Sequence, residues 1–297
     1  MRDDVRWTHL SLREIVDLFA ERGHLHISTH VIRQLLRKHH YRRRKAQKRK
    51  TMKKVAHRNE QFENITSLKQ AHHAAFNPVI SMDTKKKELI GNLYRPGQLY
   101  TQDEIQTFDH DFPSLADGVV IPHGLYDIYL NRGYLHLGTS HDTSEFSCEC
   151  FRRWWLTYGR IDYPKATCIL VLCDGGGSNH CRHIIFKEDL QHLSNELGIE
   201  IRIAHYPPYC SKYNPIEHRL FPHVTRACQG VIFKSVALVK ALMANTHTRT
   251  GLSVVVDIID KVYQTKRKAS ETFRNNVTLI CDDLLPQWNY RAVPQTE

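Results

Sequence analysis

Residues 168–174 read Cys-Ile-Leu-Val-Leu-Cys-Asp, and this stretch decides the fold class. The unbroken apolar run Cys168–Cys173 is typical of a strand that is buried on both faces of a sheet. The apolar and helical spacing of the sequence around it predicts strands at 79–83, 89–94, 119–129, 133–138 and 199–203, and helices at about 143–158 and 184–197. Strands first, followed by alternating strands and helices, predict an α/β domain with a mixed sheet and flanking helices.

Short polar residues and glycines mark where these helices should begin and end. Asp142 and Glu145 predict a capping box at the start of helix 143–158. Gly159 follows that helix and is expected to end it, as Gly198 is expected to end the helix at 184–197.

The N-terminal segment has the pattern of two short helices joined by a tight turn. Ser11 and Glu14 form a Ser-x-x-Glu capping box for a helix that reaches about Arg22, with Gly23 behind it. A second helix follows, and the pair predicts a helix-turn-helix, although an ordinary helical hairpin fits the pattern equally well. In a helix-turn-helix the start of the second helix meets the base edges of DNA. The candidate residues there are Ser28, which is also the expected N-cap, Thr29, His30 and Arg33.

Positive charge is concentrated at the same end of the chain. Residues 1–58 carry a net charge of +12, whereas the remainder carries −1. Residues 37–58 contain twelve Lys and Arg side chains and no acid, which is usually a solvated charge run. Its position directly after the candidate recognition helix favours contact with DNA phosphates instead. The phosphate-binding candidates are Arg37, Arg42, Arg43, Arg44 and Lys45.

These patterns divide the chain into three parts. We expect a helix-turn-helix DNA-binding segment at 1–45, a basic and helical linker at 46–77, and the α/β domain at 78–297. No apolar run approaches the roughly 20 residues that cross a bilayer, and the N-terminus lacks the apolar core of a secretory signal. The eight cysteines include no Cys-x-x-Cys pair, which favours reduced thiols. We therefore expect a cytoplasmic protein without membrane contact.

Three acids occupy positions where an α/β sheet places its chemistry. Asp83 ends the strand at 79–83, Asp174 ends the buried strand, and Glu217 lies in the first turn of a helix that opens at Pro215. Because sites form at the carboxyl ends of strands in such sheets, the two aspartates should share one crevice. Two or three carboxylates suffice for Mg²⁺, and two such ions stabilise the attacking and leaving oxygens of a phosphoryl displacement.

Each of these acids also has a structural interpretation. Asp174 precedes three glycines and fits a plain turn. Glu217 completes a capping set with Asn214 at the N-cap and Pro215 at N1. In a chain with 31 acids, spacing alone does not decide between the two interpretations.

Six further positions near these acids are supporting candidates. Ser178 and Asn179 could orient Asp174 or a metal-bound water, and Lys212 lies in the loop before Glu217, where it could contact phosphate. The lysines at 85–87 follow the first strand and could hold the DNA backbone. Packing or a solvated surface explains these residues equally well.

Three strings together carry a resemblance to a known family. They are Ser-Met-Asp-Thr-Lys-Lys-Lys-Glu at 81–88, Asp-Gly-Gly-Gly-Ser-Asn at 174–179, and Ser-Lys-Tyr-Asn-Pro-Ile-Glu-His-Arg at 211–219 after Pro-Pro at 207–208. The chain resembles bacterial insertion-sequence DDE transposases of the Rhodopirellula-type group, which are distantly similar to mariner-like transposases. The resemblance runs from about residue 8 to the Trp-Asn-Tyr at 288–290.

The resemblance implies a fold, a site and a reaction. The fold is an RNase H-like catalytic domain, and the catalytic triad falls on Asp83, Asp174 and Glu217, which would bind Mg²⁺ or, as a substitute, Mn²⁺. The reaction is metal-dependent cleavage and strand transfer of double-stranded DNA at terminal inverted repeats and at a target. A homodimer is expected because two ends must be paired.

One departure from the group keeps other functions open. Members usually carry more N-terminal sequence, including a further DNA-binding helical unit, before the point where this chain starts. The alternative is therefore a truncated, catalytically idle transposase that acts as a DNA-binding repressor of transposition. A third possibility, an RNase H-like nuclease of another role, agrees poorly with the helix-turn-helix pattern.

Overall fold

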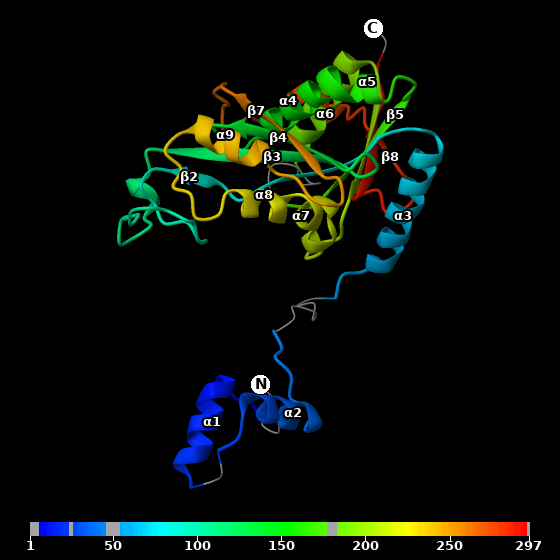
Figure 1. The fold of residues 1–297 in the computed structure, drawn as a ribbon. Helices are drawn as coiled ribbons and strands as arrows, with labels where there is room; N and C mark the ends of the chain where they lie inside the picture. Colours follow the sequence, from blue (N-terminus) through cyan, green and yellow to red (C-terminus); the bar gives the residue numbers. More distant parts are fainter. Residues whose placement is uncertain (1–5, 24–25, 46–53, 177–182, 296–297) are drawn as a thin grey trace. The chain divides into compact units, whose positions relative to one another are not determined.

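The computed structural model describes residues 6–23, 26–45, 54–176 and 183–295. The chain divides into two compact units, Met1–Met52 and Lys53–Glu297, and each is considered by itself. Figure 1 shows the ribbon, with labels for the helices and strands. Among the described residues, no helix is long and apolar enough to cross a membrane.

The first unit contains two helices, α1 (Leu12–Glu21) and α2 (Thr29–Lys38). The predicted capping box is confirmed, because Ser11 Oγ accepts a hydrogen bond from the Glu14 amide and the Glu14 carboxylate accepts one from the Ser11 amide. Ser28 Oγ accepts the Val31 amide hydrogen, so the predicted N-cap of α2 is confirmed as well.

The second unit is built around one mixed β-sheet. In the part of the chain that the structure describes, the strands follow the order β7-β4-β3-β1-β5-β6-β9-β8, and β2 pairs with β3. The strands are β1 Val79–Thr84, β2 Glu88–Ile90, β3 Gly118–Asp127, β4 Arg132–Gly138, β5 Cys168–Cys173, β6 Glu200–His205, β7 Ser253–Ile259, β8 Ile280–Cys281 and β9 Asn289–Ala292. The expected strand at 89–94 is shorter than predicted, since β2 ends at Ile90.

The five central strands carry the topology that the sequence led us to expect. They run β4-β3-β1-β5-β6, with β3 antiparallel to both of its neighbours. The pairs β1–β5 and β5–β6 are parallel. This is the RNase H-like arrangement, so the predicted α/β class with a mixed sheet is confirmed.

Helices cover both faces of the sheet (Figure 1). On one face α4 and α6 pack on Ile80 and Met82 of β1, and on the other α3 packs on Val79. The alternation along β1 follows from the strand period of two. The helices of this unit are α3 Arg58–Ala74, α4 Ser144–Trp154, α5 Arg160–Asp162, α6 Ile184–Leu197, α7 Pro215–Arg219, α8 Phe221–Ala227, α9 Val236–Ala244 and α10 Glu271–Asn275, with short 3₁₀ turns at Pro113–Leu115 and Ser211–Tyr213.

The helix that we expected within the linker lies on the sheet. Ile65 and Leu68 of α3 are buried against Val79 and Leu170 of the two central strands. Buried Gln61, also on α3, donates a hydrogen bond to the carbonyl of His205 at the end of β6. This helix therefore forms part of the second unit.

The start of α4 differs from the prediction by one residue. Thr143 is the N-cap, and its hydroxyl accepts the Phe146 amide hydrogen at 3.2 Å. The predicted capping box of Asp142 and Glu145 is wrong. The Glu145 carboxylate instead pairs with Lys261 and Arg267 from the C-terminal part of the chain.

The end of α4 also differs, because Gly159 does not terminate the helix. The chain continues through a π-helical turn, Trp155–Gly159, into α5. A Cβ atom at Gly159 would lie 2.5 Å from the Trp155 ring and 3.1 Å from the Trp154 ring. The glycine thus makes room for two tryptophans inside a helix, and this requirement has no local sequence signal.

Candidate active site

The two central strands bring Asp83 and Asp174 to the same edge of the sheet. In the parallel pair β1–β5, Met82 lies opposite Cys173. Asp83 is the next residue on β1, and Asp174 is the first residue after β5. Their side chains therefore start from neighbouring carboxyl ends of strands, where sites in α/β sheets form.

The Asp83 carboxyl group is the electrostatic centre of this edge. Its Oδ1 accepts the Thr84 amide hydrogen at 2.7 Å, and Asp174 and Glu217 lie near enough to influence its ionisation. Burial, the charge of Asp174 and the proximity of Glu217 raise the pKa of Asp83 to about 8. Near neutral pH this raised pKa favours the protonated form of Asp83.

Asp174 is held by hydrogen bonds to its side chain and to its backbone. Its Oδ1 accepts the Gly176 amide hydrogen at 3.1 Å. Its carbonyl oxygen lies 3.0 Å from Nδ1 of buried His205. A carbonyl only accepts, so His205 carries its proton on Nδ1, and its Nε2 accepts the Tyr290 hydroxyl hydrogen at 2.9 Å.

Glu217 is presented by the first turn of α7, but without the expected capping set. The Asn214 side chain makes no cap hydrogen bond to α7. Its Nδ2 donates to the carbonyl of Met82, and its Oδ1 accepts from the Ser81 hydroxyl. The predicted positions of Asn214 at the N-cap and Pro215 at the start of the helix are confirmed, whereas the predicted cap hydrogen bond of the Asn214 side chain is wrong. Sequence reasoning missed Ser81, whose only signal was a hydroxyl inside an otherwise apolar strand.

The chemistry of this cluster fits a divalent cation. Carboxylate oxygens are the preferred ligands of Mg²⁺ and suit Mn²⁺. A buried carboxyl group whose pKa is raised by two neighbouring acids gains strongly from a positive charge beside it. Among the described residues, however, no three His, Cys, Asp or Glu side chains already stand in an arrangement that could hold a metal ion.

The supporting candidates have different outcomes. Ser178 and Asn179 lie outside the described residues. Lys212 lies in the 3₁₀ turn before α7, with its ammonium 5.1 Å from the centre of the Tyr213 ring. Lys85 forms an ion pair with Glu88 that is largely shielded from solvent, whereas the lysines at 86–87 are exposed.

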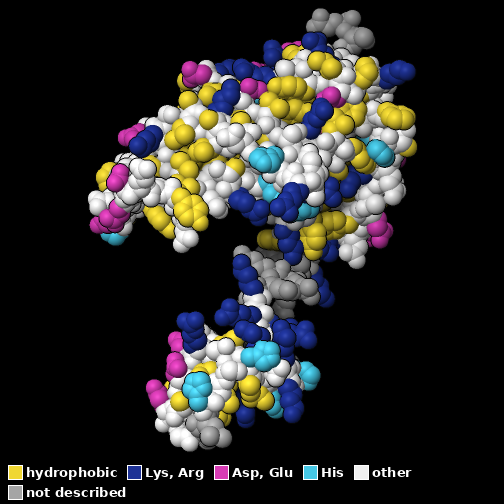
Figure 2. Space-filling model, in the orientation of Figure 1, with side chains coloured by type: hydrophobic (Ala, Val, Ile, Leu, Met, Phe, Trp, Pro, Cys, Tyr) yellow, Lys and Arg dark blue, Asp and Glu magenta, His cyan; other side chains and the backbone are white. Residues whose placement is uncertain are grey.

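The N-terminal candidates occupy α2 and the stretch after it. Thr29 is half-buried, and His30 lies within hydrogen-bond distance of Gln34 on the next turn. Basic side chains are spread over the visible face of this unit in Figure 2. All of the candidate arginine and lysine side chains are exposed, namely Arg33, Arg37, Arg42, Arg43, Arg44 and Lys45.

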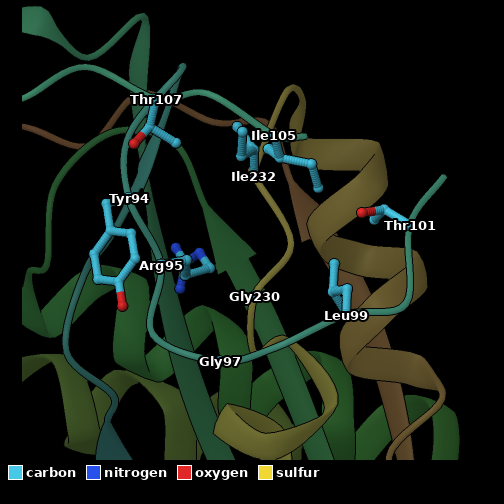
Figure 3. Close-up of a pocket in the computed structure, with 9 residues that line it drawn as sticks. All are labelled: Tyr94, Arg95, Gly97, Leu99, Thr101, Ile105, Thr107, Gly230 and Ile232. Atoms are coloured by element: carbon cyan, nitrogen blue, oxygen red, sulfur yellow. The ribbon is translucent and has the colours of Figure 1, made fainter. Parts of the chain in front are cut away.

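A cavity of about 230 Å³ lies elsewhere in the second unit. Figure 3 shows it between the loop after β2, which supplies Arg95, and the segment before α9, which supplies Gly230. The Arg95 guanidinium is already engaged, because it pairs with Glu88 and stacks on Phe233. No carboxylate lines this cavity, so it lacks the ligands that the edge near Asp83 offers.

Comparison with known proteins identifies the family. The sequence profile described as Rhodopirellula transposase DDE domain matches residues 1–294. Similar solved structures include the Mos1 transposase paired-end complex with left transposon end, at 14% identity over 81% of this chain and 72% of that chain, with a TM-score of 0.45. Another is the Mos1 mariner paired end complex with Mn, at 13% identity over 80% and 72%, with a TM-score of 0.47. A comparison with curated proteins finds no match. The profile spans nearly the whole chain, and the chain therefore belongs to the Rhodopirellula transposase DDE domain family.

Proposed function

We propose that this protein is an active DDE transposase that cleaves DNA and transfers the cut strand, with Asp83, Asp174 and Glu217 as its catalytic carboxylates. Family membership supports transposase chemistry in general. The observation that carries the finer proposal is the partly buried Asp83 carboxyl group at the end of β1, whose pKa is raised to about 8 by burial and by the two other acids. Perturbed carboxyl groups of this kind cluster at functional sites.

The three carboxylates would act by holding divalent cations beside the scissile phosphate. Bound Mg²⁺ or Mn²⁺ supplies positive charge to the attacking and leaving oxygens of the displacement. Asp83, whose pKa is raised, would have to lose its proton before it could serve as a ligand. In the first step water adds to phosphorus and the bond to the 3′ oxygen breaks, which leaves a 3′-hydroxyl and a 5′-phosphate. In the second step that 3′-hydroxyl would attack a phosphorus of the target DNA, forming a new phosphodiester bond, while the bond from that phosphorus to the 3′ oxygen of the target strand breaks and leaves a 3′-hydroxyl there.

The N-terminal unit would bring the DNA ends to this site. The start of α2, with His30 and Arg33, suits the major groove, and the basic stretch behind it suits phosphates. Double-stranded DNA is thus the proposed substrate and partner. We propose that two copies of the chain act together, since a transposable element has two ends.

The decisive experiment uses the purified chain and a plasmid that carries the DNA flanking its gene. Nicking at the element ends is expected in Mg²⁺ or Mn²⁺ and is expected to disappear in Asp174→Asn, while DNA binding persists. Nicking retained in Asp174→Asn would refute the carboxylate assignment. Binding without nicking in both proteins would support the DNA-binding repressor instead.

A further inference from the structure

We propose that Ser81 and Asn214 are positioning residues that set the separation of Glu217 from Asp83, and that Gly124 gives the helix the room to approach. This inference rests on the proposed catalytic role of the two acids. It starts from a chain of hydrogen bonds between β1 and the start of α7, two segments that lie more than 130 residues apart in the sequence.

The direction of each hydrogen bond in this chain is fixed by chemistry. The Met82 carbonyl only accepts, so the amide group of Asn214 turns its NH₂ toward that oxygen, at 3.2 Å. Asn214 Oδ1 then faces the Ser81 hydroxyl, which donates to it at 2.5 Å. The Ser81 oxygen in turn accepts the Ile216 amide hydrogen at 2.9 Å. Each of the three hydrogen bonds joins a donor to an acceptor, and turning over the Asn214 amide group would break two of them.

Burial makes this set of hydrogen bonds rigid. Ser81 and Asn214 are both fully shielded from solvent. An unpaired polar group in such a place costs about 1–3 kcal/mol, so water does not replace a lost partner cheaply. Asn214 is also unavailable to its own helix, because the side chain that would cap α7 is used across the gap to β1.

These hydrogen bonds link the backbone of β1 to the backbone of α7 directly beside the two acids. The Met82 carbonyl immediately precedes Asp83, and the Ile216 amide immediately precedes Glu217. Once both acids are ionised, as they must be to bind a cation, their like charges repel and do not fix their own separation. The hydrogen-bond chain therefore supplies what the acids themselves lack, a defined distance between the edge of β1 and the first turn of α7.

Gly124 completes the arrangement from the neighbouring strand. It lies opposite Asp83 in the antiparallel pair β1–β3. A Cβ atom at this position would lie 2.8 Å from side-chain atoms of both Ile216 and Phe221. Only a residue without a side chain lets α7 lie this close to the strand that carries Asp83.

The test compares Ser81→Ala with a matched control, Ser194→Ala. Ser194 is equally buried, and its hydroxyl lies within hydrogen-bond distance of the carbonyls of Ile199 and Ala292. Mn²⁺ binding is measured by titration calorimetry, and thermal unfolding is followed on the same samples. Ser81→Ala is expected to weaken Mn²⁺ binding about tenfold or more, as loss of groups that orient metal ligands does. Ser194→Ala is expected to lose stability while keeping the wild-type dissociation constant.

Further variants separate positioning from folding. Asn214→Ala, with Asn77→Ala as its control, carries the test if Ser81→Ala does not fold, and it is expected to weaken Mn²⁺ binding to a similar extent. Ser81→Thr keeps the hydroxyl and is expected to restore most of the affinity that Ser81→Ala loses. Equal dissociation constants for Ser81→Ala and Ser194→Ala, with wild-type binding and nicking intact, overturn the positioning role alone. If the wild-type protein shows no Mn²⁺ binding that is lost in Asp174→Asn, the proposed function is refuted. The positioning role is then refuted as well, because it rests on that function.

Discussion

At the scale of the residue, Asp83 makes stability and metal binding depend on pH in opposite ways. Its pKa is raised from 3.8 to about 8 in the folded chain, so between these values the folded state binds the extra proton. Stability is therefore highest at low pH in this window and falls as pH rises through it. Because Asp83 must lose that proton to serve as a ligand, divalent cations should bind more tightly as pH rises.

The substitution Asp83→Asn removes the titrating group on which both pH dependences rest. We expect the variant to be more stable than wild type at pH 8.5 in chelator, by more than about 1 kcal/mol, given that each pKa unit corresponds to about 1.4 kcal/mol. At pH 5 the two proteins should differ much less. Thermal unfolding at both pH values tests this, and a constant difference between variant and wild type would contradict the raised pKa of Asp83.

How far the sequence predicts this site depends on how local each interaction is. The positions of Asp83, Asp174 and Glu217 at two strand ends and a helix start were predictable from neighbouring residues, whereas their choice as a triad came from the family resemblance. The partnership of Ser81 with Asn214 was not predictable, because it forms only when strand and helix have packed. The local pattern even assigned the Asn214 side chain to a cap hydrogen bond that it does not make. The raised pKa of Asp83 likewise belongs to the folded state alone.

At the scale of the element, helix bounds that depend on neighbouring residues agree with the prediction, and bounds that depend on tertiary packing do not. The bounds of α6 and the capping box of α1 agree with the prediction, because both depend on residues three or four positions apart. The end of α4 does not, because the π-helical turn depends on how Trp154 and Trp155 pack. Glycine was interpreted there as a stop signal, whereas its role is to leave space.

Two glycine substitutions test that difference. Gly159→Ala introduces a Cβ atom 2.5 Å from the Trp155 ring, so we expect a loss of about 1–3 kcal/mol in the free energy of unfolding, as for other overpacked cores. Gly198→Ala meets no atom within 4 Å but has to adopt a positive φ of 66°, which costs about 1 kcal/mol. Denaturant unfolding measures both. A smaller loss at Gly159 than at Gly198 would contradict the packing role of Gly159.

At the scale of the whole molecule, charge is divided between the two units. The formal net charge of +11 arises from residues 1–58, whereas the rest of the chain is close to neutral. If the basic segment neutralises DNA phosphates, affinity for any duplex should fall steeply with salt, because each neutralised phosphate releases counterions. The carboxylate site adds no attraction of its own for a polyanion. Binding and chemistry should therefore be separable by substitution.

Replacing Arg42, Arg43 and Arg44 with alanine tests this separation. We expect weaker duplex binding and a slope of log affinity against log salt that is shallower by about 3, close to one unit for each phosphate that an arginine no longer neutralises. Nicking at saturating DNA should stay close to wild type. The control replaces Lys165, Lys266 and Lys268, which are exposed on the second unit, and removes the same net charge. If both triple variants reduce the slope equally, long-range charge rather than direct binding by the basic segment governs affinity; if only the arginine variant does, the phosphates lie against residues 42–44.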